Sequence, residues 1–329
     1  MKILYSIPSE YKGIGWGGVM TYTLNLAREL KRQGHNVTIL TPGEIFTRYK
    51  HHGVSIFTID NTHHTTLGQK LLRKLFPMFL DRLLWISAII KFLKHHEPFD
   101  VIEAPEWGAG GLLFSISGKT KVIIRLHRSL YQYYVDNHLP ITIDLRLVNM
   151  LEMISILFAH AITYPTNFIW NSHPFMTWIA SIKRTPHMLI PNGLPINKLI
   201  KGKAQRKRAT APYILTVGRL EYGKGLHTLV EAFTKISSKF PDIKLIIIGR
   251  DMKTVHENKL VNYKKLLFQY ITKHTLKRMI HIYDQKPHNQ LSEYYSNCLF
   301  YVMPASGHEN HPLALLEALS YGKAVIISD

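Results

Sequence analysis

The order of strand, glycine-containing loop and helix occurs twice in this chain, and this repetition constrains the fold more than any other feature. KILYSI (2–7) precedes the loop GIGWGG (13–18) and the segment 19–34, whose apolar residues recur at helical spacing. The order returns in YILTVG (213–218), the loop RLEYGKG and an amphipathic segment over 226–240. We therefore predict two successive α/β units, each with a parallel sheet covered by helices.

Further apolar runs end in polar residues, as buried parallel strands do. These runs are DVIEAP (100–105), KVIIRLH (121–127), KLIIIG (244–249), LFYVMP (299–304) and KAVIIS (323–328).

The segment 190–212 is rich in proline, glycine and basic residues, which is typical of an interdomain linker. A length of 329 residues suits two domains of ordinary size. We expect an N-terminal domain over 1–197, a linker over 198–212 and a C-terminal domain over 213–329.

The formal net charge of +19 indicates an anionic partner, which could be nucleic acid, a phosphorylated ligand or an anionic membrane surface. No aromatic and basic nucleic-acid module accompanies this charge, so we expect no nucleic-acid partner. Cys298 is the single cysteine, which excludes an internal disulfide and fits a reducing compartment. The apolar run at the N-terminus is too short for a signal peptide, and we expect a cytoplasmic protein.

The segment LLRKLFPMFLDRLLWISAIIKFLKHH (71–96) is both apolar and basic. One interpretation is a helix packed on the first sheet, which Pro77 kinks or splits. The other is a basic amphipathic surface in peripheral contact with an anionic membrane, on its inner face. We favour packing for most of its apolar residues and keep shallow membrane contact as a hypothesis.

The loop VGRLEYGKG places Arg219 and Lys224 between a strand and the start of a helix. Helix N-termini bind anions, and two nearby cations suit a diphosphate. The alternative is a solvated loop in which neither cation binds a ligand.

The stretch GHENHPLALLE places Glu309 in a loop and Glu317 in the second turn of the helix that follows. We expect Pro312 at the first helical position, Gly322 at the end of the helix, and an inner face of Leu313, Leu316, Ala318 and Leu319. Both carboxylates then face one pocket at the carboxyl edge of the sheet and accept hydrogen bonds from sugar hydroxyls. The alternative is an exposed loop acid and an ordinary helical glutamate.

VGRLEYGKGLHTLVEAF and HENHPLALLEALSYGKAVI together resemble the donor-site signatures of family-four retaining glycosyltransferases, and Glu309 and Glu317 match the E-x7-E motif of that family. The resemblance extends to the loop at Gly17 and Gly18, to DVIEAPEWGAGG (100–111), to the strand ending at His127 and to PNG (191–193). It implies the GT-B fold, in which two Rossmann-like domains with parallel sheets face each other across a cleft.

The resemblance also implies roles for individual residues. Arg219 and Lys224 would bind the donor diphosphate, Glu317 the nucleotide ribose, and Glu309 the hydroxyls of the transferred sugar as a catalytic residue. His127 would be the second catalytic residue, facing the reacting centre from the acceptor side. The remaining implied donor-binding residues are Gly17, Gly18, Asn310, His311 and Leu313.

The implied reaction moves a sugar from a UDP- or GDP-linked donor to a glycan or lipid-linked acceptor, in surface polysaccharide biosynthesis, with retained anomeric configuration. Neither metal nor cofactor is implied. The sequence has no D-x-D motif, and Arg219 and Lys224 can replace a cation electrostatically. Alternatives are another GT-B enzyme such as a nucleotide-sugar epimerase, a truncated non-catalytic donor-binding remnant, or a basic membrane-surface or nucleic-acid binder.

Three features depart from the family pattern, one of which is Pro304-Ala305-Ser306 in place of the Pro-Ser that is common after strand 299–304. Asp284 and Gln285 stand where the family often has a glycine, near the residues that usually contact the nucleobase. The sequence ends at Asp329, directly after a strand, whereas family members normally continue. We therefore expect the second domain to be incomplete.

Overall fold

The computed structural model describes residues 1–8, 17–60, 66–96, 98–112, 114, 120–172, 178, 181–194, 211–257, 259–273 and 276–328. The chain forms two compact units. The first comprises Met1–Tyr133 and Ile141–Gly193, and the second comprises Tyr134–Pro140 and Leu194–Asp329. Of the predicted loop 13–18, only Gly17 and Gly18 are among the described residues, and of the predicted linker 198–212, only residues 211–212 are.

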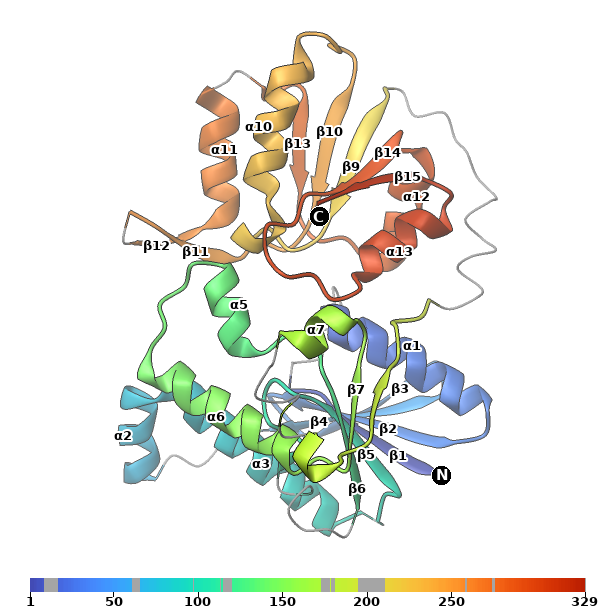
Figure 1. Ribbon diagram of the computed structural model, residues 1–329, viewed down its shortest axis with the longest axis vertical. Helices are drawn as coiled ribbons and strands as arrows, with labels where there is room; N and C mark the ends of the chain where they lie inside the picture. Colours follow the sequence, from blue (N-terminus) through green and yellow to red (C-terminus); the bar gives the residue numbers. More distant parts are fainter. Residues whose placement is uncertain are drawn as a thin grey trace. The chain divides into compact units, whose positions relative to one another are not determined.

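The described strands of the first unit form one sheet in the order β3-β4-β2-β1-β5-β6-β7-β8. Neighbouring strands are parallel except in the antiparallel β3–β4 pair. The strands are β1 Lys2–Ser6, β2 Asn36–Gly43, β3 Thr47–His51, β4 Val54–Asp60, β5 Val101–Pro105, β6 Lys121–Arg125, β7 Ala161–Tyr164 and β8 His187–Leu189. The helices in this part of the chain (Figure 1) are α1 Gly18–Arg32, α2 Leu67–Leu75, α3 Pro77–Lys94, α5 Leu130–Asp136, α6 Ile143–Leu157 and α7 Asn167–Asn171.

Alternate residues of β1 face opposite layers of the first unit, as the period of a strand requires. Leu4 belongs to a core cluster with Trp85 of α3. Tyr5 belongs to a separate cluster with Leu24 of α1. The sheet is therefore buried on both faces, which explains why its central strands read as continuous apolar runs.

The described strands of the second unit form a parallel sheet in the order β13-β10-β9-β14-β15, accompanied by the antiparallel β11–β12 hairpin. The strands are β9 Tyr213–Val217, β10 Lys244–Ile248, β11 Lys253–His256, β12 Lys259–Asn262, β13 Ile280–Tyr283, β14 Phe300–Met303 and β15 Ala324–Ile327. The helices are the 3₁₀ turn η1 Tyr222–Lys224, α10 Leu226–Ser237, α11 Tyr263–Lys273, α12 His288–Asn297 and α13 Leu313–Ser320.

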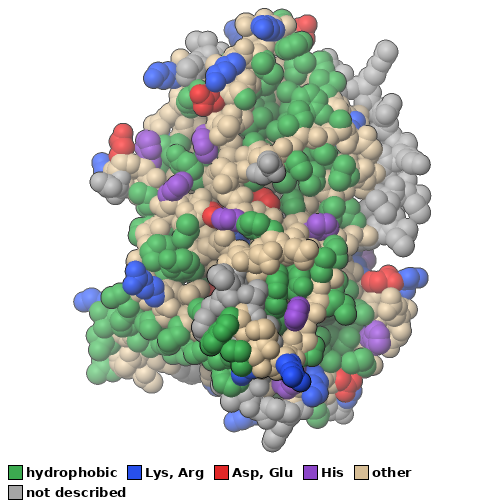
Figure 2. Space-filling model, viewed as in Figure 1, with side chains coloured by type: hydrophobic (Ala, Val, Ile, Leu, Met, Phe, Trp, Pro, Cys, Tyr) green, Lys and Arg blue, Asp and Glu red, His purple; other side chains and the backbone are tan. Residues whose placement is uncertain are grey.

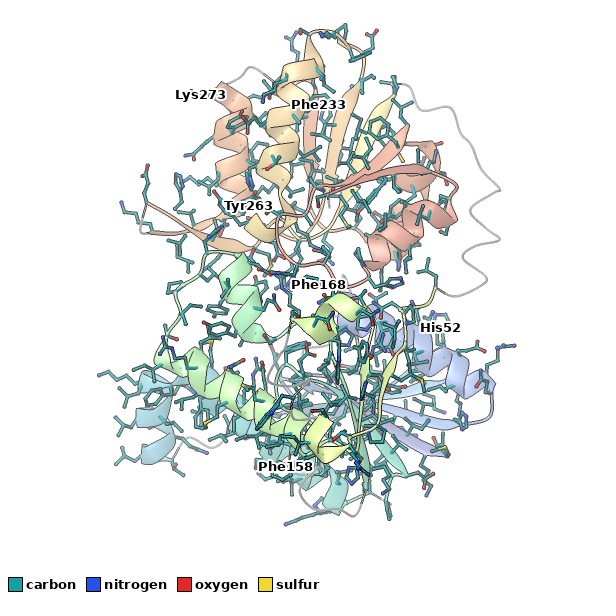
Figure 3. All side chains as sticks on the ribbon, viewed as in Figure 1. His52, Phe158, Phe168, Phe233, Tyr263 and Lys273 are labelled. Atoms are coloured by element: carbon teal, nitrogen blue, oxygen red, sulfur yellow. The ribbon has the colours of Figure 1, made fainter. Side chains whose placement is uncertain are left out.

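The second sheet is also covered on both faces. Ile214 of β9 clusters with Phe233 of α10 and Tyr263 of α11, both of which are labelled in Figure 3. The next residue, Leu215, clusters with Tyr295 of α12 and with residues of α13. The predicted α/β fold with parallel sheets is confirmed.

The basic apolar segment 71–96 is divided between two helices, because Phe76 ends α2 and Pro77 begins α3. The apolar residues of α3 supply the core, as expected, through Leu80, Trp85, Ile86, Ile89 and Phe92. None of the described residues of α2 is buried. Within the described parts of the chain, no helix has both the length and the apolar character needed to cross a membrane.

Candidate functional site

The strand order of the second unit places two loops at the same edge of the sheet. β9 lies between β10 and β14, and all three strands are parallel. The loops after β9 and β14 therefore leave at the carboxyl edge, where the order of connections reverses. Open α/β sheets bind ligands at such a point.

Gly225 lies where the turn after β9 packs against the loop after β14. Its φ of +60° is left-handed, and a Cβ atom added there would lie 1.8 Å from the carbonyl oxygen of Pro304. The backbone N–H groups of Ser306 and Gly307 donate to the carbonyl oxygen of Gly223, at 3.2 and 2.9 Å. Glycine is therefore required at position 225, and the two loops form one rigid arrangement.

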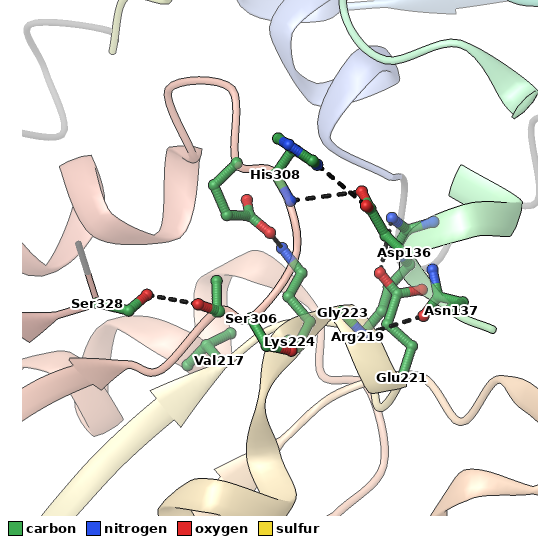
Figure 4. Close-up of polar contacts among 12 residues, drawn as sticks. Asp136, Asn137, Val217, Arg219, Glu221, Gly223, Lys224, Ser306, His308 and Ser328 are labelled. Atoms are coloured by element: carbon green, nitrogen blue, oxygen red, sulfur yellow. Dashed lines mark hydrogen bonds and ion pairs between the residues drawn. The ribbon is translucent and has the colours of Figure 1, made fainter. Parts of the chain in front are cut away.

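This arrangement brings Lys224 and Glu309 together. Lys224 Nζ forms an ion pair with Glu309 Oε1 (Figure 4), and the two side chains are only 19% and 17% exposed. Arg219 Nη2 lies 2.9 Å from Oε1 of the buried Glu221. Cations and carboxylates therefore alternate along the edge where sequence analysis predicts a donor site.

Glu317 lies in the second turn of α13 and is 5% exposed. Its Oε1 is 2.7 Å from Nε2 of His288, the first residue of α12. Tyr301 of β14 lies close to both predicted carboxylates. Burial raises the pKa of Tyr301 above its usual value, and Glu309 and Glu317 add to the rise.

The start of α13 differs slightly from the prediction. Pro312 is the N-cap, with φ −69° and ψ 127°, so the helix begins at Leu313. Gly322, with φ +67°, follows the helix, and its N–H donates to Leu319 O. The predicted inner face is wrong at Leu319, which is 49% exposed, and of the other predicted members only Ala318 is fully buried, since Leu313 and Leu316 are half-buried. The apolar residues of α13 that pack into the core are Ala314, Leu315 and Ala318.

Three further residues that are predicted to bind the sugar donor lie around this helix start. Asn310 and His311 precede Pro312, and Leu313 follows it; all three are partly buried. His311 has a φ of +55°, which is uncommon for a residue other than glycine. The structure therefore brings seven predicted site residues together in the second unit, namely Arg219, Lys224, Glu309, Asn310, His311, Leu313 and Glu317.

Gly17, Gly18 and His127 lie in the first unit. Gly17 is the N-cap of α1 and Gly18 its first residue. A Cβ atom at either position would meet no described protein atom within 4 Å. The described protein atoms thus give no packing reason for glycine at these two positions.

His127 follows β6, and Glu106 holds its backbone. The N–H of His127 donates to both carboxyl oxygens of Glu106, at 2.7 and 2.8 Å. The His127 ring meets the Tyr22 ring edge-on, with 5.6 Å between centroids. Burial, assisted by the nearby Arg125 cation, lowers the pKa of His127 to about 3, so its imidazole is neutral at pH 7.

Two buried glutamates support the loops around His127, and sequence analysis assigned neither of them a role. Glu152 of α6 accepts hydrogen bonds from the N–H groups of Gly108 and Leu130, at 3.1 and 3.3 Å. Burial raises the pKa of Glu106 to about 8 and that of Glu152 to about 7. The two carboxyls therefore hold protons at a pH where ordinary glutamates are ionised.

The buried Arg125 ties the segment PNG (191–193) to the end of β6. Its Nη2 donates to Ile190 O at 2.7 Å and to Asn192 Oδ1 at 2.9 Å. Its guanidinium lies 4.4 Å from the centroid of the Tyr22 ring.

Within the described residues, no group of three or more His, Cys, Asp or Glu side chains could hold a metal ion. Independence from metals and cofactors stays a prediction.

Comparison with known proteins identifies related families and folds. A family model described as Glycosyltransferase Family 4 matches residues 16–198, and one described as Glycosyl transferases group 1 matches residues 198–329. The uncharacterized glycosyltransferase MJ1607 of Methanocaldococcus jannaschii is 24% identical over 338 residues, covering 95% of this chain and 76% of that protein.

Solved structures also resemble the chain. Sucrose-phosphate synthase from Thermosynechococcus elongatus superimposes with a TM-score of 0.73 at 18% identity, covering 99% of this chain and 81% of that one. Anabaena Alr3699/HepE in complex with UDP-glucose gives a TM-score of 0.66 at 16% identity, with 99% and 80% covered.

Proposed function

The chain belongs to Glycosyltransferase Family 4 and is a glycosyltransferase of the GT-B type, and from this premise we propose that it transfers a sugar from a UDP- or GDP-linked donor to a glycan or lipid-linked acceptor, with retained anomeric configuration. One observation carries this proposal: the partly buried Lys224–Glu309 pair lies where the turn after β9 meets the loop that leads into α13. The complex of HepE with UDP-glucose supports a donor of this kind.

The chemistry of the donor site follows from its charges. When the bond between the sugar C1 and the phosphate oxygen breaks, negative charge grows on the departing nucleoside diphosphate. In this proposal Lys224 and Arg219 stabilise that charge, and a preorganised cation lowers the barrier because the charge is greatest in the transition state. Glu309 then accepts hydrogen bonds from the sugar hydroxyls.

The other residues near α13 bind the nucleotide in this proposal. His288 contacts one carboxyl oxygen of Glu317, and in this proposal the oriented carboxylate accepts hydrogen bonds from the ribose hydroxyls. The amides of Asn310, His311 and Leu313 and the positive end of the α13 dipole attract phosphate oxygens.

The first unit supplies the acceptor side in this proposal. The neutral His127 is the proposed catalytic residue for the acceptor, and Gly17 and Gly18 are proposed donor-binding residues, whose lack of a side chain suits a close approach to phosphates. No metal or cofactor takes part, because the cations of the second unit supply the positive charge. The reaction serves surface polysaccharide biosynthesis in the cytoplasm.

The proposal is tested by incubating the protein with UDP- and GDP-linked sugars and candidate glycan or lipid-linked acceptors, then measuring the nucleoside diphosphate released and the anomeric configuration of the product. We expect acceptor-dependent release that is lost in Lys224→Ala. Lys235→Ala is the control, since Lys235 is 75% exposed and its nearest carboxylate partner is 3.9 Å away. An isomerised donor sugar without acceptor would indicate an epimerase, and donor binding without turnover a non-catalytic remnant.

Helix α2 supports a second proposal, which is peripheral contact with an anionic membrane. Leu67, Leu71 and Leu75 recur every fourth residue and are 86%, 61% and 57% exposed. Lys70 and Lys74 are exposed on the same short helix. Figure 2 shows hydrophobic side chains gathered where Figure 1 places α2. An apolar stripe flanked by basic side chains matches the chemistry of an anionic lipid surface.

Sedimentation with vesicles of anionic or neutral phospholipid at low salt tests this contact. We expect the protein to sediment with anionic vesicles alone, and Leu71→Glu to weaken partitioning by about tenfold. Leu260→Glu is the matched control, since Leu260 of β12 is 58% exposed. Failure of the wild-type protein to sediment with anionic vesicles would reject the proposal.

A further inference from the structure

A short segment from the first half of the sequence forms part of the second unit. Tyr134–Pro140, which contains the end of α5 and the turn after it, groups with Leu194–Asp329. Asp136, Asn137 and His138 make the contacts of this segment with the two turns that carry Lys224 and Glu309.

Asp136 contacts the loop after β14. Its Oδ2 accepts a hydrogen bond from the N–H of His308 at 3.3 Å, and its Oδ1 lies 3.0 Å from His308 Nδ1 (Figure 4). The Asp136 side chain is only 5% exposed. A Cβ atom added to Gly307 would lie 3.0 Å from Asp136 Cβ, so the carboxylate is packed tightly against this loop.

Asn137 and His138 contact the turn after β9. The Oδ1 atom of the buried Asn137 accepts a hydrogen bond from the N–H of Gly223 at 3.1 Å. The His138 ring meets the Tyr222 ring edge-on, with 5.0 Å between centroids. Gly223 immediately precedes Lys224, and His308 immediately precedes Glu309, so the hydrogen bonds of Asn137 and Asp136 each reach a residue next to a member of the ion pair.

We propose that Asp136 and Asn137 are positioning residues for the donor site, because they fix the two backbone turns from which Lys224 and Glu309 project. The inference rests on the proposed function for its catalytic consequence, but the bracing itself is a property of the protein without ligand. Loss of a brace loosens the turn that it contacts, although the hydrogen bonds to Gly223 O still join the two turns to each other. The Lys224 ammonium and the Glu309 carboxylate are then misplaced relative to the diphosphate and the sugar.

The first test needs no ligand. Amide hydrogen exchange is measured for peptides covering the turn at Gly223 and the loop at His308 in the wild-type protein, Asp136→Ala and Asn137→Ala. We expect about tenfold faster exchange in both regions for Asp136→Ala and mainly at Gly223 for Asn137→Ala. Unchanged exchange at both places in folded variants would overturn the inference.

The second test measures kcat and the donor KM. Asp136→Ala is expected to lower kcat by about tenfold with a smaller change in KM, since misplaced charges matter most in the transition state. Asp136→Asn should restore most of kcat, because its oxygen still accepts from the His308 N–H and its amide can donate to His308 Nδ1 in the tautomer that carries its proton on Nε2. An equal loss of kcat in Asp136→Asn and Asp136→Ala would indicate a merely structural role. Equal changes in kcat and KM, together with a lower temperature of thermal unfolding, would indicate the same.

Asp144→Ala is the matched control. Asp144 is 6% exposed and accepts hydrogen bonds from the N–H groups of Met78 and Phe79, both at 2.9 Å in the first unit. Its loss should lower thermal stability but leave exchange at Gly223 and His308 unchanged. A wild-type protein that binds no nucleoside diphosphate would reject the proposed function, while the exchange result would still decide the bracing.

Discussion

His288 Nε2 lies 2.7 Å from Glu317 Oε1, and this contact joins the first residue of α12 to the second turn of α13. Glu317 is nearly buried, whereas the His288 side chain is 41% exposed. A buried carboxylate needs hydrogen-bond donors, and an imidazole at this distance also fixes the direction of the carboxyl group. The residue that we propose for ribose binding is therefore oriented by the protein itself.

His288→Ala should weaken nucleoside diphosphate binding by about fivefold, the factor that corresponds to the roughly 1 kcal/mol of one hydrogen bond. His288→Gln should bind more tightly than His288→Ala, because its amide can still donate. Calorimetric titration measures both. His256→Ala, on the β11–β12 hairpin, serves as control, since its nearest carboxylate partner is 3.9 Å away. Equal affinity of His288→Ala and wild type would exclude this role for His288.

Lys224→Ala should lower kcat by about a hundredfold, the usual scale for removing one preorganised group that stabilises charge in the transition state. Lys224→Arg keeps the charge with another geometry and should retain intermediate activity. Steady-state rates at saturating donor measure the effect, and denaturation checks that both variants are folded. Full activity of Lys224→Ala would contradict the proposed role of this cation.

Gly225→Ala should destabilise the second unit by more than about 2 kcal/mol. A left-handed backbone costs a residue other than glycine about 1–2 kcal/mol, and the added Cβ would also overlap the Pro304 carbonyl oxygen, 1.8 Å away. Urea denaturation measures the loss. Gly322→Ala isolates the backbone cost, because Gly322 has a φ of +67° but no described atom within 4 Å of an added Cβ. Equal losses in the two variants would show that the overlap relaxes without cost.

The buried Glu106 and Glu152 should make the first unit less stable as pH rises. Burial raises their pKa values from 4.5 to about 8 and about 7, so the folded state binds more protons than the unfolded state between these limits. The contribution of the neutral carboxyl groups to the free energy of unfolding is greatest below pH 4.5 and decreases as pH rises toward 8. Each unit of pKa shift corresponds to about 1.4 kcal/mol.

Glu106→Gln tests this dependence, because it keeps the shape of the side chain but cannot ionise. Urea denaturation between pH 5 and pH 8 should show a shallower decline for the variant than for wild type. His127 has the opposite dependence. Burial lowers its pKa to about 3, so the unfolded state binds a proton below pH 6.5 that the folded state does not, and the free energy of unfolding falls with pH. Parallel curves for Glu106→Gln and wild type would show that Glu106 is ionised in the folded protein.

The sequence was sufficient to predict the elements that carry local patterns. KLIIIG and LFYVMP form strands, and the loop after β14 leads into a helix that places Glu317 in its second turn. The error at Leu319 has a clear cause. The face of α13 that packs inward includes the carboxylate of Glu317, so hydrophobicity alone misplaces that face.

Contacts between distant residues could not be predicted from the sequence. Asp136 and His308 are 172 positions apart, and nothing in either local sequence indicates the other. Strands β3, β11 and β12 were also missed, because these short strands lack clear apolar alternation. The division of 71–96 into a buried α3 and an exposed α2 depended on tertiary packing, although Pro77 marked the boundary.

The proposed donor site is best tested by calorimetric binding of UDP, GDP and ADP to the wild-type protein, with Glu317→Ala and Lys224→Ala measured alongside. We expect saturable binding of one nucleoside diphosphate, with lower affinity in both variants. If a demonstrably folded protein bound none of the three, or if the affinity were unchanged in both variants, the proposed donor site would be wrong.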